Sequence, residues 1–533
     1  MEVKDQIREF LQKHKTQVWI FLTTFICGYL IHFYMFTNKF LNYFEMNNIL
    51  TGMSFYKGDT VEQGKWMIPI LSSASSVFSM PAVNGIMGIT FLSLFSLAVC
   101  ELLQIRSRFF GSLVGLVVMT YPSIASYFAY GVNTDVLTIA PCMAVLSVWL
   151  IEKNRRVRKK TQRIVGITTG VLLIGMTVGA YQPFFAIIIA GVYAILFVQV
   201  VEKGESFSQL LQTIFFYLMV LVLGFLIYYL GLQLVIFLTG VQLGDYHGVN
   251  EMTSFTIRGI AKGFVYTYFY FFRYFFTLEY TNYPILIVAN LILACLLVGM
   301  TIYQLGKRKR ITNILSGIVL LCLLPLGTNA SPFLMADRVG NGVDRYMMFS
   351  IIFNYFLTIR MLISFPWRKA VKGKTIRHLV QWVAVFAVLT TIISGIYMCN
   401  QAYYRMETMT EQESALLNRV VGRMEEVEGW SKEIPVYFAN CSNLFNDNYD
   451  VDIPQFETLT RMDGTKLEPW YNRSAIAKYM RVYLHFPVNE ATEEQGKQLE
   501  QTEEYQQMGI YPAENSIQII NNVMVVKFND KAD

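Results

Sequence analysis

Long runs of apolar residues constrain this chain more than any other feature of its sequence. A helix needs about 20 mostly apolar residues to cross the roughly 30 Å hydrocarbon layer of a bilayer. Hydrophobic residues make up 54% of the 533 positions. The sequence therefore predicts an all-α polytopic transmembrane bundle of about 11 helices. The predicted spans are residues 17–36, 77–101, 109–128, 132–151, 164–180, 184–201, 209–230, 284–304, 311–327, 345–364 and 379–399.

Two further stretches, residues 231–240 and 257–276, leave two interpretations open. They could add another pair of spans, or they could be interfacial or re-entrant segments that do not cross the membrane. Residues 264–276 are densely aromatic, and aromatic rings are typical of the membrane–water interface.

Charge is divided unevenly along the chain. Residues 400–533 carry 22 acidic and 12 basic residues, whereas the first 399 residues carry 16 acidic and 32 basic ones. Such a split indicates two compartments in one polypeptide. We expect a cytoplasmic segment at residues 1–16, a transmembrane domain at 17–399 and an extracytoplasmic domain at 400–533.

The C-terminal region has a secondary-structure pattern of its own, typical of a small α/β or α+β domain. Alternating apolar residues on either side of Asn521-Asn522 predict a β-hairpin. The expected elements are helices at 403–429, 473–484 and 493–506, a strand at 434–440, and hairpin strands at 517–520 and 523–528.

Orientation follows from the basic residues in the short loops. Lys and Arg collect in cytoplasmic loops of membrane proteins, and the loops after the fourth, eighth and tenth predicted spans are rich in them. This pattern predicts a multi-pass protein of the cell membrane with a cytoplasmic N-terminus and an extracytoplasmic C-terminal domain. The loop residues are Arg155, Arg156, Arg158, Lys159 and Lys160, then Lys307 to Arg310, then Arg368, Lys369, Lys372, Lys374 and Arg377.

Several classes of function are excluded by what the sequence lacks. No cytoplasmic segment is long enough for a nucleotide-sugar or ATP-binding domain, and no glycine-rich phosphate-binding motif is present. The basic residues do not form the aromatic-rich stripe of a nucleic-acid-binding protein, so we expect no nucleic-acid partner. No CxxC motif or Cys/His cluster predicts a metal site. No cofactor is required, although a divalent metal remains open.

The first outer loop, residues 37–76, holds the acidic residues best placed for catalysis. If residues 40–56 form a helix on the membrane, Asn42, Glu45 and Asn48 lie on one side of it. A carboxylate there could accept the proton of an acceptor hydroxyl, which requires hydrogen-bond reach. Glu45 is the first candidate base, and Asp59 and Glu62 are substitutes. The alternative is that all three are solvated loop residues.

Basic residues near the outer ends of the spans could bind a phosphate. Arg338 and Arg345 flank the third outer loop, and Arg273 lies in the aromatic stretch. A leaving phosphate gains negative charge in the transition state, which a fixed cation stabilises. The alternative for Arg345 is an interfacial arginine or a structural contact with Asp344. Tyr181 and Gln182 could contact a sugar, or they could simply end a helix before Pro183.

Taken in order, these residues resemble the GtrII-like glucosyltransferases, a family of the GT-C class of membrane glycosyltransferases. The resemblance covers roughly residues 15–400 and implies a GT-C-like bundle. The family pattern has an Asn-His-Asp type motif where this chain has Asn42 to Glu45, and Gly-Arg-Trp where it has Gly64-Lys65-Trp66. The other landmarks are Tyr121-Pro122, the Ser126–Tyr130 stretch, Tyr181-Gln182 and an arginine, Arg345, that opens a late span.

The resemblance implies a polyprenyl-phosphate-linked sugar donor, a hexose such as glucose, and a surface polysaccharide or wall polymer as acceptor on the outer face. It assigns substrate binding to Asn42, Lys65, Trp66 and the tyrosine–glutamine pair. Direct displacement at the anomeric carbon would invert its configuration. Two rival functions stay open. One is a transporter or flippase for a lipid-linked glycan, and the other is a polysaccharide polymerase or ligase of the same topology.

Overall fold

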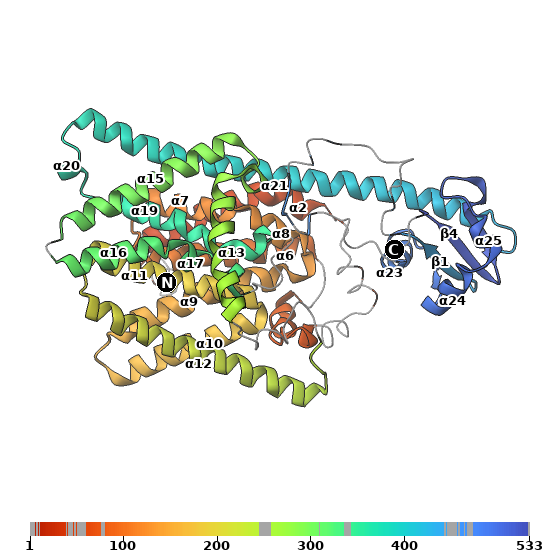
Figure 1. The fold of residues 1–533 in the computed structure, drawn as a ribbon, viewed down its shortest axis with the longest axis horizontal. Helices are drawn as coiled ribbons and strands as arrows, with labels where there is room; N and C mark the ends of the chain where they lie inside the picture. The colour runs from red at the N-terminus through yellow and green to blue at the C-terminus, as the bar shows by residue number, and fades with distance from the viewer. Residues whose placement is uncertain are drawn as a thin grey trace.

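The computed structural model joins a bundle of long helices to a small β-sheet domain through one extended helix (Figure 1). The nine longest apolar segments among the described residues could each cross a membrane. The predicted helical bundle followed by a small α/β domain is confirmed. The structure describes residues 6, 9, 11–38, 40, 46, 50, 60–75, 80–244, 257–308, 310–334, 343–441, 444, 453, 456, 459–462, 464–465 and 473–530.

The helices that supply the candidate spans follow the predicted order. Three of the segments include short helices: a 3-10 turn precedes α9, a 3-10 turn and a π-helix flank α11, and the 3-10 helix η7 (Arg345–Ile352) precedes α19. The main helices are α2 (Lys15–Thr37), α6 (Pro81–Leu102), α9 (Thr134–Arg155), α10 (Lys160–Ala180), α11 (Phe185–Val198), α12 (Phe207–Thr239), α15 (Pro284–Gly306), α19 (Phe353–Ser364) and α21 (Lys374–Glu425).

Two predicted spans are broken by proline. The span expected at 109–128 consists of α7 (Arg108–Met119) and α8 (Pro122–Ala129), bent by 49°. The span expected at 311–327 consists of α16 (Ile311–Cys322) and α17 (Leu324–Thr328). Pro122 and Pro325 each stand in the first turn of the second helix. Proline is favoured there because that position needs no backbone N–H donor, and it cannot continue the helix before it.

The structure assigns the two ambiguous stretches to different helices. Residues 231–239 continue α12, which ends at Gly240 in the left-handed conformation. Residues 257–276 form α13 (Ile257–Phe276), which runs across the direction of α12 and α15 (Figure 1). Its apolar side chains Phe264, Val265 and Phe269 are exposed. A helix with an exposed apolar face that lies across the bundle is typical of the membrane interface.

Small residues let the helices approach closely. On α7, Gly111 and Gly115 face α2: a Cβ on Gly115 would lie 1.9 Å from the Thr24 hydroxyl oxygen, and one on Gly111 would lie 2.2 Å from Ile20. Glycines four residues apart are a common way to pack helices in lipid, where van der Waals contact replaces the hydrophobic effect as the driving force.

Helix α21 runs for 52 residues from the bundle into the C-terminal domain, so the span and the helix predicted at 403–429 are one helix. Its last turns contribute Leu416, Leu417, Val420 and Met424 to the domain core. The sheet has the order β2-β1-β4-β3, with β1 parallel to β2 and β4, and β3 antiparallel to β4. The strands are β1 (Pro435–Ala439), β2 (Asn489–Glu490), β3 (Ile517–Ile520) and β4 (Val523–Lys527).

The predicted hairpin is present as β3 and β4. Its turn residues Asn521 and Asn522 both have positive φ, 50° and 60°, as a two-residue turn of type I′ requires. The predicted helix at 493–506 is divided into α24 (Glu493–Leu499) and α25 (Glu503–Gln506), because Thr502 caps a new helix. The remaining helix of the domain is α23 (Arg473–Tyr483).

The bundle has two distinct ends. We call one the basic end: it carries the loops at 156–159, 307–310 and 365–373 and the start of α2, whose Gln17 donates to Glu101. We call the other the tail end: it holds α13, the turn between α10 and α11, and the start of η7. Figure 1 shows α20 (Trp367–Ala370) and the α15–α16 connection far from the β-sheet domain, which extends from the tail end.

Candidate active site

Residues 60–75, the described stretch before α6, pack against the tail end through Trp66. The indole ring lies between α10 and α12: a Cβ on Gly179 would lie 2.6 Å from it, and one on Gly231 2.5 Å. The Met67 N–H donates to the Gly179 carbonyl at 2.9 Å. Trp66 therefore holds the loop in place by filling a gap between two helices, and its indole N–H is buried without a partner among the described residues.

Lys65 is turned toward the bundle by the same loop. Gly64 has a φ of 71°, which only glycine adopts easily, and the Lys65 N–H closes the turn on the Thr60 carbonyl at 2.8 Å. The Lys65 Nζ donates to Gln63 Oε1 at 2.7 Å and lies 5.5 Å from the ring centre of Tyr181. Burial lowers the pKa of Lys65 to about 8, because the charged form is poorly solvated there.

Tyr181 and Gln182 form the predicted break between α10 and α11, and they lie beside Lys65. Gln182 donates from Nε2 to the Gln63 carbonyl at 2.9 Å, so its amide supports the loop. The Tyr181 ring stacks on Tyr346 at 6.1 Å. Tyr346 directly follows Arg345, and this contact links the Lys65 group to the second group of polar residues.

Arg345 is the largest fully buried side chain of the described chain. Its Nη2 donates to the Glu279 carbonyl at 3.2 Å and to Asn282 Oδ1, and its Nη1 contacts the sulfur of Met398 at 3.1 Å. The Nε–H has no hydrogen-bond partner among the described residues. A buried guanidinium that is incompletely paired is costly, and this position is therefore a candidate for binding an anion.

A cavity lies beside Arg345. It is small and partly open to solvent, and Tyr280 and Met398 line it as well as contacting the arginine. The lining is mostly aromatic and apolar with a few hydroxyl and amide groups, a composition usual for ligand sites. The remaining lining residues are Val117, Thr120, Tyr121, Pro122, Tyr274, Thr281, Leu286, Asn290, Tyr355 and Thr391.

Arg273 is paired, and its partner was not predicted from the sequence. Glu279, in the short helix α14 (Leu278–Thr281), accepts from Arg273 Nη2 on one carboxylate oxygen and from Arg461 Nε at 2.9 Å on the other. Arg461 belongs to the C-terminal region. The only sequence signal for Glu279 was an acidic residue six positions after Arg273 in an otherwise aromatic stretch.

The remaining predicted residues divide into two groups. Glu62 is exposed, and its backbone carbonyl accepts from the Gly244 N–H at 3.1 Å. Asn42, Glu45, Asp59 and Arg338 lie outside the described residues. Among the residues that the structure describes, no group of three or more His, Cys, Asp or Glu side chains could hold a metal ion.

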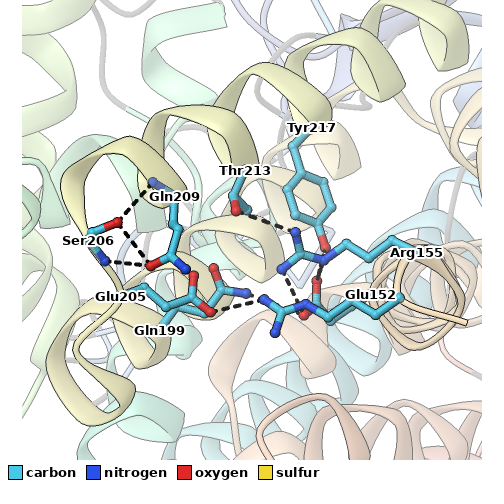
Figure 2. A network of polar contacts seen from close by, with 9 residues as sticks. Glu152, Arg155, Gln199, Glu205, Ser206, Gln209, Thr213 and Tyr217 are labelled. Carbon is cyan, nitrogen blue, oxygen red and sulfur yellow. Dashed lines mark hydrogen bonds and ion pairs between the residues drawn. The ribbon is translucent and has the colours of Figure 1, made fainter.

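The basic end holds a polar network of a different kind (Figure 2). Glu152 pairs with Arg155 at 2.5 Å and accepts from the Tyr217 hydroxyl at 2.7 Å, and Arg156 pairs with Glu205 at 3.0 Å. Nearby, Arg360 pairs with Glu202 at 2.5 Å. Each of these three arginines pairs with a carboxylate, and the ion pairs join helices of the basic end.

Comparison with known proteins gives one match. The family model described as "Glucosyl transferase GtrII" matches residues 33–362. The matched range contains Lys65, Tyr181, Gln182, Arg273 and Arg345, but it ends before α21 and the C-terminal domain. No curated protein and no solved structure matches the chain.

Proposed function

The chain belongs to the GtrII glucosyltransferase family, and we propose that it moves a hexose such as glucose from a polyprenyl-phosphate carrier to a surface polysaccharide or wall polymer outside the cell. Membership of the family makes it a multi-pass membrane glycosyltransferase. The carrier, the acceptor and the outer-face site are the parts that we propose.

One observation carries the proposal: Arg345 is fully buried, its Nε–H has no partner among the described residues, and it lies beside a small pocket lined by Tyr280 and Met398. In the proposed reaction an acceptor hydroxyl attacks the anomeric carbon, the bond from that carbon to the phosphate oxygen breaks, and polyprenyl phosphate leaves. The leaving phosphate gains negative charge, and a preorganised guanidinium would stabilise that charge more in the transition state than in the ground state.

The other candidate residues take supporting roles in this proposal. Lys65 would add a second cation at the first outer loop, with Tyr181 and Gln182 holding its position through the contacts described above. Glu45 would accept the proton of the acceptor hydroxyl, with Asp59 or Glu62 as substitutes. Arg338 and Asn42 remain proposed substrate-binding residues.

The proposed orientation places the basic end in the cytoplasm and the tail end outside. It is supported by the excess of Lys and Arg in the loops of the basic end. Residues 1–16 would then be cytoplasmic, 17–399 would span the membrane, and 400–533 would be extracytoplasmic. In a cysteine-free background, Arg481→Cys should react with an impermeant thiol reagent in intact cells, whereas Arg158→Cys should react only after permeabilisation.

The decisive experiment offers the purified protein two donors. A polyprenyl-phosphate hexose with an acceptor oligosaccharide should yield polyprenyl phosphate and an acceptor longer by one hexose, measured by mass spectrometry. A nucleotide hexose should yield neither. Transfer from the nucleotide donor alone would contradict the proposal, transfer of an oligosaccharide would favour a polymerase, and vesicle transport without product would favour a flippase.

A further inference from the structure

A short part of the C-terminal region returns to the membrane bundle. We call it the tail segment: residues 459–462, 464 and 465, as far as the structure describes them. Leu459 and Met462 are almost fully buried and belong to the core of the bundle, whereas the rest of the C-terminal domain has its own core. The tail segment is therefore packed as part of the membrane domain, although it follows α21 in sequence.

A buried arginine on α21 holds the tail segment at both ends. Arg405 donates from Nη1 to the Leu459 carbonyl at 2.9 Å, and from Nε to the Thr465 carbonyl at 3.2 Å. It also donates from Nη2 to the Thr465 hydroxyl. Gly464, with a φ of 79°, lies against Tyr130 so closely that a Cβ would be 2.7 Å from the ring. These contacts fix the positions of Thr460 and Arg461 between the two ends.

The middle of the tail segment contacts the residues that hold Arg345. The Arg345 N–H donates to the Arg461 carbonyl at 3.1 Å, and Thr460 donates from its hydroxyl to the Glu279 carbonyl. That carbonyl also accepts from Arg345 Nη2 at 3.2 Å. The Arg461 Nε–H donates to the Glu279 carboxylate at 2.9 Å. The tail segment, α14 and the start of η7 are thus joined by four hydrogen bonds.

Glu279 is the shared acceptor of this cluster. Its carboxylate pairs with Arg273 and Arg461, and its backbone carbonyl accepts from Arg345 and Thr460. Hydrogen bonding to Glu279 raises the pKa of Arg461 above its ordinary value against the opposing effect of burial, and Asp344 contributes to that rise. Arg461 is therefore a charged guanidinium beside the residues that hold Arg345.

We infer that the tail segment is part of the donor-phosphate site, with Arg461 as a positioning residue that fixes Arg345 and adds positive charge where the phosphate binds. This inference rests on the proposed function. Arg461 is suited to the mouth of the site because its side chain is 31% exposed, whereas Arg345 is buried. The C-terminal domain would then complete the active site from outside the range matched by the family model.

The experiment measures donor binding and turnover separately. Arg461→Gln should raise the KM for polyprenyl-phosphate hexose by about 10- to 100-fold, the value of one charge-assisted contact, with a smaller change in kcat. Arg461→Lys should recover part of the loss, since it keeps the charge. Arg481→Gln, at an exposed position of α23, is the matched control for charge removal in the same domain and should leave both constants unchanged.

A milder variant and a binding measurement distinguish weaker donor binding from a folding defect. Thr460→Val removes one hydrogen bond to α14 and no charge, so it should lower kcat while the KM changes less than in Arg461→Gln. A short-chain polyprenyl phosphate without sugar should raise the thermal transition of the wild type but not that of Arg461→Gln. Equal kinetic constants and equal stabilisation in wild type and Arg461→Gln would overturn the inference, whereas absent binding and turnover in the wild type would overturn the proposed function itself.

Discussion

The two ends of the bundle use the same residue types in opposite ways. At the basic end, Arg155, Arg156 and Arg360 each pair with a separate glutamate. At the tail end, Arg273 and Arg461 share Glu279, and Arg345 is held by neutral acceptors. The basic end also has an arginine held by neutral acceptors, since Arg308 donates to the Val201 and Glu202 carbonyls. Arg345 differs because it lies beside a pocket lined by Tyr280 and Met398, so the pocket rather than the number of cations marks the candidate binding site.

Removing one arginine from each end breaks this comparison most sharply. Arg345→Gln should lower the rate of transfer by about 10²- to 10³-fold, the usual cost of losing a group that stabilises transition-state charge. Arg360→Gln should retain kcat and KM while lowering stability by about 1–3 kcal/mol, because Glu202 loses its main partner. Turnover and thermal unfolding of both variants in detergent provide the measurement. Equal loss of activity in the two variants would remove the distinction between the ends.

Substituting one glycine at each end tests whether close packing at the tail end is needed for activity as well as for stability. Gly179→Ala would push a Cβ to 2.6 Å from the Trp66 ring, which should cost about 1–3 kcal/mol and displace Lys65, so activity falls with stability. Gly204→Ala at the basic end places alanine at a φ of +67°, which should cost about 1 kcal/mol. Activity per folded molecule should fall only in the first variant, measured against the folded fraction from size-exclusion chromatography.

The pH dependence of Lys65 sharpens the comparison, since its pKa is lowered to about 8. If its charge assists donor binding, kcat/KM should fall about tenfold between pH 7 and pH 9. Stability should change the other way: the unfolded chain binds the proton up to pH of about 10.4, so the free energy of unfolding should rise from pH 8 to pH 10. Lys65→Arg should remove the decline in activity. A flat profile in the wild type would show that the charge of Lys65 is not used.

The smallest effects should come from single hydroxyl groups. Tyr217→Phe removes the hydrogen bond to Glu152 at the basic end, and Tyr280→Phe removes the one to the Val343 carbonyl, 2.6 Å away at the tail end. Each should cost about 0.5–1.5 kcal/mol of stability. Only Tyr280→Phe should also raise the KM for the donor, because Val343 lies two residues before Arg345. Initial rates at several donor concentrations would detect the difference.

Much of the fold could be predicted from the sequence because it depends on local composition and periodicity. Nine of the predicted spans match described helical segments long and apolar enough to cross a membrane, a tenth matches the bent pair of α7 and α8, and the span predicted at 311–327 contains the shorter apolar helix α16 followed by α17. The hairpin was found from Asn521-Asn522. The helix breaks before Pro122 and Pro325 were missed because the apolar pattern continues through them. The crossing direction of α13 was also left open, since an aromatic stretch of this length fits a span or an interfacial helix equally well.

The candidate site was only partly predictable. Lys65, Tyr181 and Gln182 were identified individually, and the structure brings them together. Glu279 and Arg461 were missed, although they form an ion pair, because they are 182 positions apart in sequence. No periodicity relates two loops at such a separation, and neither residue stands in a motif.

By itself, the sequence determined that this protein is a helical membrane protein with a small C-terminal domain. A long apolar segment in lipid must satisfy its backbone hydrogen bonds internally, and an α-helix does so. The tertiary structure alone decided which charged side chains meet. Pairing of arginines with carboxylates depends on where loops return after crossing the bilayer, and α21 brings the tail segment back to Arg345 through the contacts of Arg405. For that reason the amino-acid pattern showed where charges occur, while the packing of the chain brought Arg345, Glu279 and Arg461 together beside a pocket.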